Sequence, residues 1–129
     1  MALKLNPSFA AKADSNGNYP LHHIIIRRPF RVKDVEIISK LLEAYPDAAG
    51  IRNNEGSAPL FIALKEKMGW EEGLGEIIKA DSDTLSSRDM DTALYPFLLA
   101  ASVGGRVAVN NTYNLLIANP HLIREALAR

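Results

Sequence analysis

Cysteine is absent from this 129-residue sequence, which excludes disulfide bonds and thiolate metal sites. Long apolar runs are missing too, because even runs such as Phe97–Ala101 are far shorter than the roughly 20 residues a helix needs to cross a bilayer. The first residues contain no long apolar stretch followed by a cleavage site, so no secretory signal is predicted. Together these absences favour a cytoplasmic or nuclear location, with an organelle as the remaining option.

A surplus of charge of one sign is also missing, since 15 Lys and Arg residues balance 15 Asp and Glu residues. No overall electric field therefore attracts the protein to nucleic acid or to an anionic membrane. The local exception is a basic cluster, Arg27–Lys33, which surrounds Phe30 and could hold phosphates and stack on a base. Asp34 and Glu36 follow it directly, so a solvated loop is the favoured interpretation. A helical nucleic-acid-binding domain that uses this cluster is the alternative function.

What the sequence does contain is a repeat. Two prolines and one glycine near the start each recur 39 residues later, as Pro7 and Pro46, Gly17 and Gly56, and Pro20 and Pro59. A looser third copy has Pro96 at 37 residues after Pro59, with Ala93 in the glycine position. Periods of 20 to 50 residues are typical of stacked supersecondary units.

Each unit predicts two helices. The first helix begins at a proline, which suits the opening turn, and covers about 20–27, 59–67 and 96–103. The second helix shows apolar or small residues at helical spacing on one face. These residues are Val35, Ile38, Leu41 and Leu42, then Leu74, Ile77 and Ile78, and finally Val109, Thr112, Tyr113 and Leu116. No segment alternates cleanly enough to predict a strand.

The first unit resembles the ankyrin repeat. Asp14–His22 is similar to the ankyrin signature of an acidic or amide residue, a glycine and a Thr-Pro-Leu-His tetrad, with Tyr19 in place of the threonine. The endings Leu41–Ala49 and Leu115–Pro120 resemble a divergent ankyrin subgroup of single-celled eukaryotes, in which Leu-Leu-x-x-Tyr/Asn-Pro replaces the usual glycine. The units here exceed the usual period of about 33 residues, so the loops between helices carry insertions.

This resemblance implies an all-α fold, namely an ankyrin-like helix-turn-helix repeat solenoid of about three helix pairs. It implies one domain over residues 1–129, with a partial unit at 1–13 and further units at 14–52, 53–89 and 90–129. It also implies a protein–protein interaction or scaffolding module without enzymatic activity, cofactor or metal. The contact residues carried over by position are Ser15, Asn16, Asn18, Arg27, Asn54, Glu55, Ser57, Lys65, Glu66, Asp91, Thr92, Leu94 and Ser102.

The histidines and paired carboxylates have simpler interpretations than metal binding or catalysis. His22 and His23 are adjacent on a predicted helix, so their side chains point about 100° apart and do not readily share one ion. His22 is expected to bond to neighbouring turns, as the ankyrin histidine does, and His121 is isolated. Glu71 and Glu72 are expected to favour the positive end of a helix dipole. The sequence therefore contains no catalytic constellation.

Two further features leave alternatives open. Trp70 is either an exposed anchor for a partner or a ring packed on its own helix pair, and packing is favoured. Neither end of the chain has a fully polar sequence, since Leu3, Leu5 and Phe9 stand at the start and Leu122, Ile123 and Leu127 at the end. Terminal repeats normally carry polar outer faces. We therefore expect a fragment of a longer array, or a subunit whose ends are covered in a larger assembly.

Overall fold

The computed structural model describes residues 7–26, 32–121 and 124, and contains no strand in these ranges. This confirms the predicted all-α class. The α-helices are α1 (Pro7–Ala10), α2 (Pro20–Ile26), α3 (Val32–Ala44), α4 (Pro59–Lys65), α5 (Leu74–Ala80), α6 (Pro96–Val103) and α7 (Ala108–Ala118). There are also three short 3-10 helices: η1 (Pro46–Gly50) follows α3, η2 (Trp70–Glu72) precedes α5, and η3 (Asp83–Ser86) follows α5. None of the described helices has the length and apolar character needed to cross a membrane.

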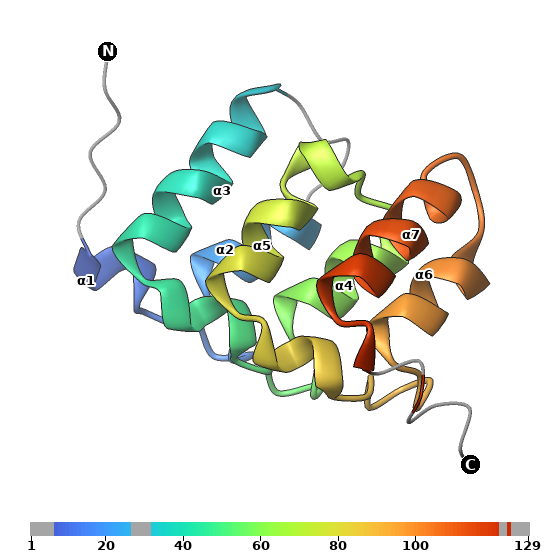
Figure 1. Cartoon of the computed structure of the whole chain (residues 1–129). Helices are drawn as coiled ribbons and strands as arrows, with labels where there is room; N and C mark the ends of the chain where they lie inside the picture. Colours follow the sequence, from blue (N-terminus) through green and yellow to red (C-terminus); the bar gives the residue numbers. More distant parts are fainter. Residues whose placement is uncertain (1–6, 27–31, 122–123, 125–129) are drawn as a thin grey trace.

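The helices pack as three neighbouring pairs, α2 with α3, α4 with α5, and α6 with α7 (Figure 1). The first helices lie side by side, because α4 contacts both α2 and α6. The second helices form another row, in which α3 contacts α5, whereas α7 reaches the middle pair through η2. The apolar core lies between these two rows of helices and is centred on fully buried side chains such as Ile25, Phe61 and Leu74.

The first helix of each pair begins at a proline, namely Pro20 in α2, Pro59 in α4 and Pro96 in α6. The residues before Pro59 and Pro96 are extended, with ψ of 155° at Ala58 and 156° at Tyr95. A proline at the first helical position has a fixed φ and no N–H to leave unpaired, so it starts a helix without losing a hydrogen bond. These starts confirm the sequence prediction. The second of these helices is shorter than predicted, because it ends at Lys65.

The second helices also end alike. Tyr45, Asp81 and Asn119 have φ/ψ of −151°/82°, −149°/95° and −146°/76°, and each N–H still bonds to the carbonyl four residues earlier. A proline follows Tyr45 and Asn119, and proline disfavours helical geometry in the residue before it. Asp81 reaches this conformation without a proline, and its carboxylate accepts bonds from Asp83 N–H and Thr84 Oγ1.

Candidate functional site: the turn ridge

The first turn, Asp14–Asn18, is closed by bonds within its own backbone. Asp14 N–H donates to Asn18 O at 3.0 Å, and Gly17 N–H donates to Asp14 O at 3.0 Å. Asp14 Oδ1 accepts the N–H groups of Asn18 and Asn16 at 3.0 and 2.9 Å. The bond from Asn18 is the main cause that lowers the pKa of Asp14. Gly17 has φ of 77°, a left-handed conformation that glycine adopts without steric strain.

The second turn, Asn53–Ser57, has the same geometry. Asn53 N–H donates to Ser57 O at 3.0 Å, and Gly56 N–H donates to Asn53 O at 2.9 Å. Asn53 Oδ1 accepts the N–H groups of Glu55 and Ser57, both at 3.0 Å. Gly56 has φ of 81°. Asp14 and Asn53 are interchangeable here because both offer a side-chain oxygen that bonds to N–H groups two and four residues ahead.

The third turn, Asp89–Leu94, is one residue longer. Asp89 N–H donates to Leu94 O at 2.9 Å, and Ala93 N–H donates to Asp89 O at 2.8 Å. Ala93 has φ of 62°, which confirms its predicted place as the counterpart of the two glycines. The offset of 37 residues that relates Pro59 to Pro96 would pair Asn53 with Met90. Because the third turn has one extra residue, the residue that closes it is Asp89 instead.

Asp89 is buried and anchors this third turn. Its Oδ2 accepts bonds from Thr92 N–H and Thr92 Oγ1 at 3.0 and 2.8 Å and pairs with Lys65 Nζ at 3.0 Å. Lys65 Nζ also lies 3.6 Å from Asp91 Oδ2. Burial raises the pKa of Asp89, but the bonds from Lys65 and Thr92 outweigh it, so the pKa lies below its usual value. The carboxylate therefore stays charged and holds α4 to the turn.

The first and second turns bond to each other directly, and Arg52, just before the second turn, bonds to the residue just before the third. Asn54 N–H donates to Asn16 O at 2.9 Å, Asn54 Nδ2 donates to Ser15 O at 3.0 Å, and Asn53 Nδ2 donates to Asn18 Oδ1 at 2.8 Å. Arg52 links the second turn to the third, because its guanidinium donates to Gly56 O at 2.9 Å and to Arg88 O at 3.2 Å. We call this continuous surface, made of Asp14–Asn18, Asn53–Ser57 and Asp89–Leu94, the turn ridge.

His22 lies buried beneath the turn ridge. Its Nδ1 accepts Tyr19 N–H at 3.0 Å, so its Nε2 carries the proton and donates to Ile51 O at 2.9 Å. Burial lowers the pKa of His22, and the bond to Ile51 only partly opposes this, so the ring is neutral at pH 7. This confirms the predicted role of His22 in joining turns. The counterparts of His22 in the next two first helices are Phe61 and Leu98.

The predicted contact residues divide into exposed and structural ones. Exposed ridge side chains are Ser15, Asn16, Asn54, Glu55, Asp91 and Thr92, although Asn54 also holds the first turn to the second. Half-buried ones are Asn18, Ser57, Lys65, Glu66 and Leu94, and the exposed Ser102 donates its Oγ proton to Leu99 O at 3.0 Å. Arg27 and the basic cluster Arg27–Lys33 lie outside the residues whose side chains are described.

Sequence reasoning missed Met90, which is 70% exposed on the third turn and packs its side chain against Gly56. An apolar residue inside an otherwise polar turn was the available signal. Trp70, in contrast, packs against the core, as the favoured alternative predicted, with its indole against Gly75. Glu72 accepts Gly69 N–H at 2.6 Å and so caps η2.

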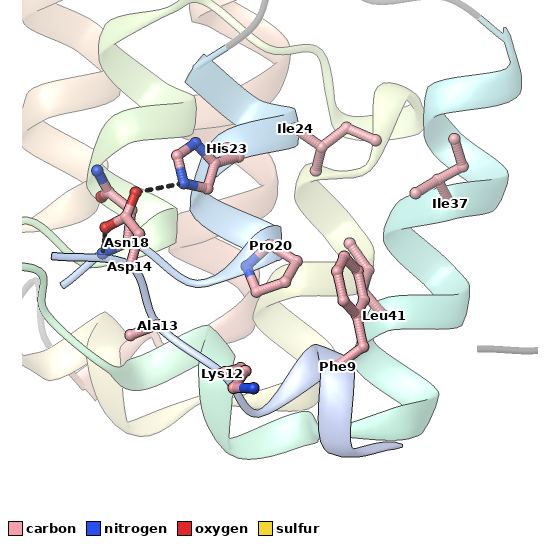
Figure 2. A pocket seen from close by; sticks show the side chains of 10 residues that line it. All are labelled: Phe9, Lys12, Ala13, Asp14, Asn18, Pro20, His23, Ile24, Ile37 and Leu41. Carbon is pink, nitrogen blue, oxygen red and sulfur yellow. Dashed lines mark hydrogen bonds and ion pairs between the residues drawn. The ribbon is translucent and has the colours of Figure 1, made fainter. Parts of the chain in front are cut away.

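A second feature that sequence reasoning missed is a groove of about 580 Å³ on the outer side of the first helix pair (Figure 2). Its apolar wall is formed by Phe9, Pro20, Ile24, Ile37 and Leu41. Its polar rim contains Lys12, Asp14 and His23, and His23 Nε2 lies 2.7 Å from Asp14 Oδ2. Among the described residues no three histidine or carboxylate side chains gather in a way that could hold a metal ion.

No family model, no curated protein and no solved structure was found to match this chain.

Proposed function

We propose that the protein is an ankyrin-like repeat solenoid of three helix pairs that binds another protein through its turn ridge. The observation that carries this proposal is the set of hydrogen bonds that connect the turns, directly between the first and second and through Arg52 and Arg88 between the second and third. Asn54 holds Ser15 and Asn16 of the first turn, and Arg52 holds the third turn through Arg88 O. The exposed tips of three separate segments thereby form one surface.

A surface of this kind suits protein binding because its backbone is already ordered. Association is opposed by the loss of freedom of loops and side chains, so turns that are fixed by internal bonds lose less on binding. In an isolated loop the same polar side chains would have to be ordered by the partner. The internal bonding of the ridge therefore favours a binding role over a merely solvated one.

The side chains at the ridge indicate the chemistry of the partner. Met90 offers an apolar contact, and methionine is enriched at protein interfaces. Glu55 and Asp91 are exposed carboxylates on neighbouring turns. We expect the partner to place an apolar side chain on Met90 and Lys or Arg side chains near Glu55 and Asp91, because complementary charges steer and orient association.

The test begins with affinity capture from the native source, followed by mass spectrometry, and a dissociation constant for the recovered partner. A variant with Asn16→Ala, Glu55→Ala, Met90→Ala and Asp91→Ala removes the exposed tips and leaves Asn54 and Arg52 in place. We expect it to bind at least about tenfold more weakly, since a few central residues carry most of the binding energy.

The matched control replaces exposed charged residues of the second helices, Glu43, Glu76 and Lys79, with alanine. This control should retain the affinity of the unmodified protein. Circular dichroism must show equal helicity for both variants. A ridge variant that binds as tightly as the control would move the interface away from the turns.

A further inference from the structure

The short helix α1 sits on the first helix pair as η1 sits on the second. α1 contacts α2 and α3, and η1 contacts α4 and α5. Ala10 and its counterpart Ala49, 39 residues later, are both buried. η1 follows α3 in the chain, so the end of the first helix pair packs on the second pair. By analogy, α1 packs on the first pair in the place where the end of a preceding helix pair would lie. The groove beside α1 then lies where the helices of such a pair would pack.

Positions that line the groove are covered in the later pairs. His23 on α2 has its side chain 56% exposed, its counterpart Ile62 on α4 is half-buried, and Leu99 on α6 is only 2% exposed. Ile37 lines the groove. Its counterpart in the second pair is Gly73, because each precedes its equivalent helix end, Tyr45 or Asp81, by the same number of residues. Gly73 faces Ile38 of the first pair. A Cβ on Gly73 would lie 2.9 Å from Ile38 Cδ1. Inside the molecule, therefore, the preceding pair covers this face.

At the α6/α7 end of the molecule, positions that are buried in the first two pairs become exposed in the third. His22 and Ile25 of α2, and their counterparts Phe61 and Leu64 of α4, are all buried. In α6 the same positions are Leu98, which is 38% exposed, and Ala101, which is exposed. Each first helix thus has one face for the pair before it and one for the pair after it, and among the described residues no further pair covers the last such face.

The sizes of the side chains at the two uncovered ends complement each other. At the groove, Ile24 and Ile37 are larger than their internal counterparts Ala63 and Gly73. At the far end, Leu98 and Ala101 are smaller than Phe61 and Leu64. The contact between the first and second pairs combines the large His22 and Ile25 of the preceding pair with the small Ala63 and Gly73 of the following pair. Contact between the two ends of the molecule would exchange these roles. Apolar contacts tolerate such swaps when total volume is kept.

We propose that the groove of one copy receives the α6/α7 end of a second copy, so that the molecules associate head to tail. This inference rests on the proposed repeat stack. Asp14 and Asn18 at the groove's rim also belong to the turn ridge, but none of the four residues changed in the ridge variant lines the groove. The contact is heterologous, because different surfaces meet, and repeated contacts build open chains rather than closed dimers. The balanced charge of 15 basic and 15 acidic residues means that no net repulsion opposes association. α1 has only four residues, and it must give way where the incoming Asn119–His121 segment takes its place.

The test is sedimentation velocity of the full chain over a wide concentration range. The unmodified protein should show an average mass that rises with concentration. Ile37→Glu in the groove and Leu98→Glu at the far end should each weaken association by about 100-fold or more, because each buries an unpaired carboxylate. The decisive sample is a mixture of the two variants. Each retains one intact surface, so the mixture should form a one-to-one dimer that grows no further.

The control Lys79→Glu adds negative charge to the middle pair and should associate like the unmodified protein. Circular dichroism establishes folding, and if Ile37→Glu fails to fold, His23→Glu replaces it, because His23 lines the groove on α2 and its side chain is 56% exposed. A monomer at all concentrations, association that survives either variant, or a mixture that stays monomeric would each overturn the proposal. The proposed function is tested separately, since the ridge variant should self-associate normally.

Discussion

The second and third turns differ in length by one residue, yet both place a left-handed residue three positions before a proline, and they do so by different chemistry. In the second turn Gly56 supplies the left-handed residue, and the neutral Asn53 side chain closes the loop. In the third turn Ala93 adopts that conformation at a cost of about 1–2 kcal/mol, since its Cβ crowds the backbone. The buried pair of Asp89 and Lys65 holds this turn. The comparison shows that a turn lacking its glycine can be kept when a charged anchor offsets the strain.

The largest effect is expected at that anchor. Asp89→Ala should lower the free energy of unfolding by about 2–3 kcal/mol, because it removes charge-assisted bonds from Lys65 and Thr92. Asn53→Ala in the second turn should lower it by about 1–2 kcal/mol, since only neutral bonds are lost. Urea unfolding followed by circular dichroism measures both changes. Equal losses would contradict a special role for the buried charge.

The charge of Asp89 also predicts a pH dependence. The folded pKa lies below the ordinary value of 3.8, so the stabilisation is complete well above that value and disappears as pH falls through the folded pKa. Below pH 4 the unfolding free energy of the unmodified protein should therefore decline more steeply than that of Asp89→Asn. Denaturant unfolding at a series of pH values tests this, and parallel curves would show that the carboxylate contributes nothing.

The next largest effect concerns the glycines. Gly17→Ala and Gly56→Ala should each destabilise the protein by about 1–2 kcal/mol through left-handed strain. Gly17→Ala should be the worse of the two, because its new Cβ would lie 2.9 Å from the backbone nitrogen of Asn54. At Gly56 the nearest atoms belong to the flexible Met90 side chain. Thermal unfolding ranks the variants, and the reverse order would show that the first two turns are not held together as described.

A smaller effect of opposite sign is expected at Ala93. Ala93→Gly relieves the strain at φ of 62° and should stabilise the protein by up to about 1 kcal/mol, after the greater chain entropy of unfolded glycine is subtracted. The measurement is the shift in unfolding midpoint relative to Gly56→Ala. A destabilised Ala93→Gly would mean that the third turn is not strained.

The smallest effect lies beneath the turns, where His22 and Phe61 occupy counterpart positions. The folded pKa of His22 is below 6.5, so the unfolded chain binds more protons as pH falls below that value. The contribution of the neutral His22 ring to the free energy of unfolding is therefore complete well above pH 6.5, and it is lost as pH falls towards the folded pKa. His22→Phe should flatten the decline of the unfolding free energy as pH falls below about 6.5. An unchanged slope would assign the dependence to another group.

Local signals in the sequence were sufficient for much of the fold. Pro20, Pro59 and Pro96 fix helix starts because proline suits only the first turn of a helix. Gly17 and Gly56 mark turns because other residues are strained there. The bonding role of His22 also followed from its position in the signature. The helix starts and the glycine turns depend on chemistry within a few residues, whereas the bond of His22 to Ile51 O, 29 residues away, was implied by the resemblance to the ankyrin signature.

Features that depend on distant contacts could not be predicted in this way. The longer third turn is anchored by Lys65, which lies 24 positions before Asp89. Asn54 was predicted as a binding residue, yet its amide bonds to Ser15 O across the interface between two turns. The groove at Ile37 exists because no helix pair precedes the first in the described structure, and no local pattern reports a missing neighbour.

The alignment of the three turns can be measured directly, because a chain without cysteine allows spin labels to be placed only where cysteines are introduced. Ser15 and Asp91 are exposed on the first and third turns. Pulsed electron resonance on the Ser15→Cys, Asp91→Cys variant should give one narrow distance distribution near 20 Å, about twice the usual spacing of 8–10 Å between packed helices. A distribution spread over several times that distance would show that the turns do not form one surface.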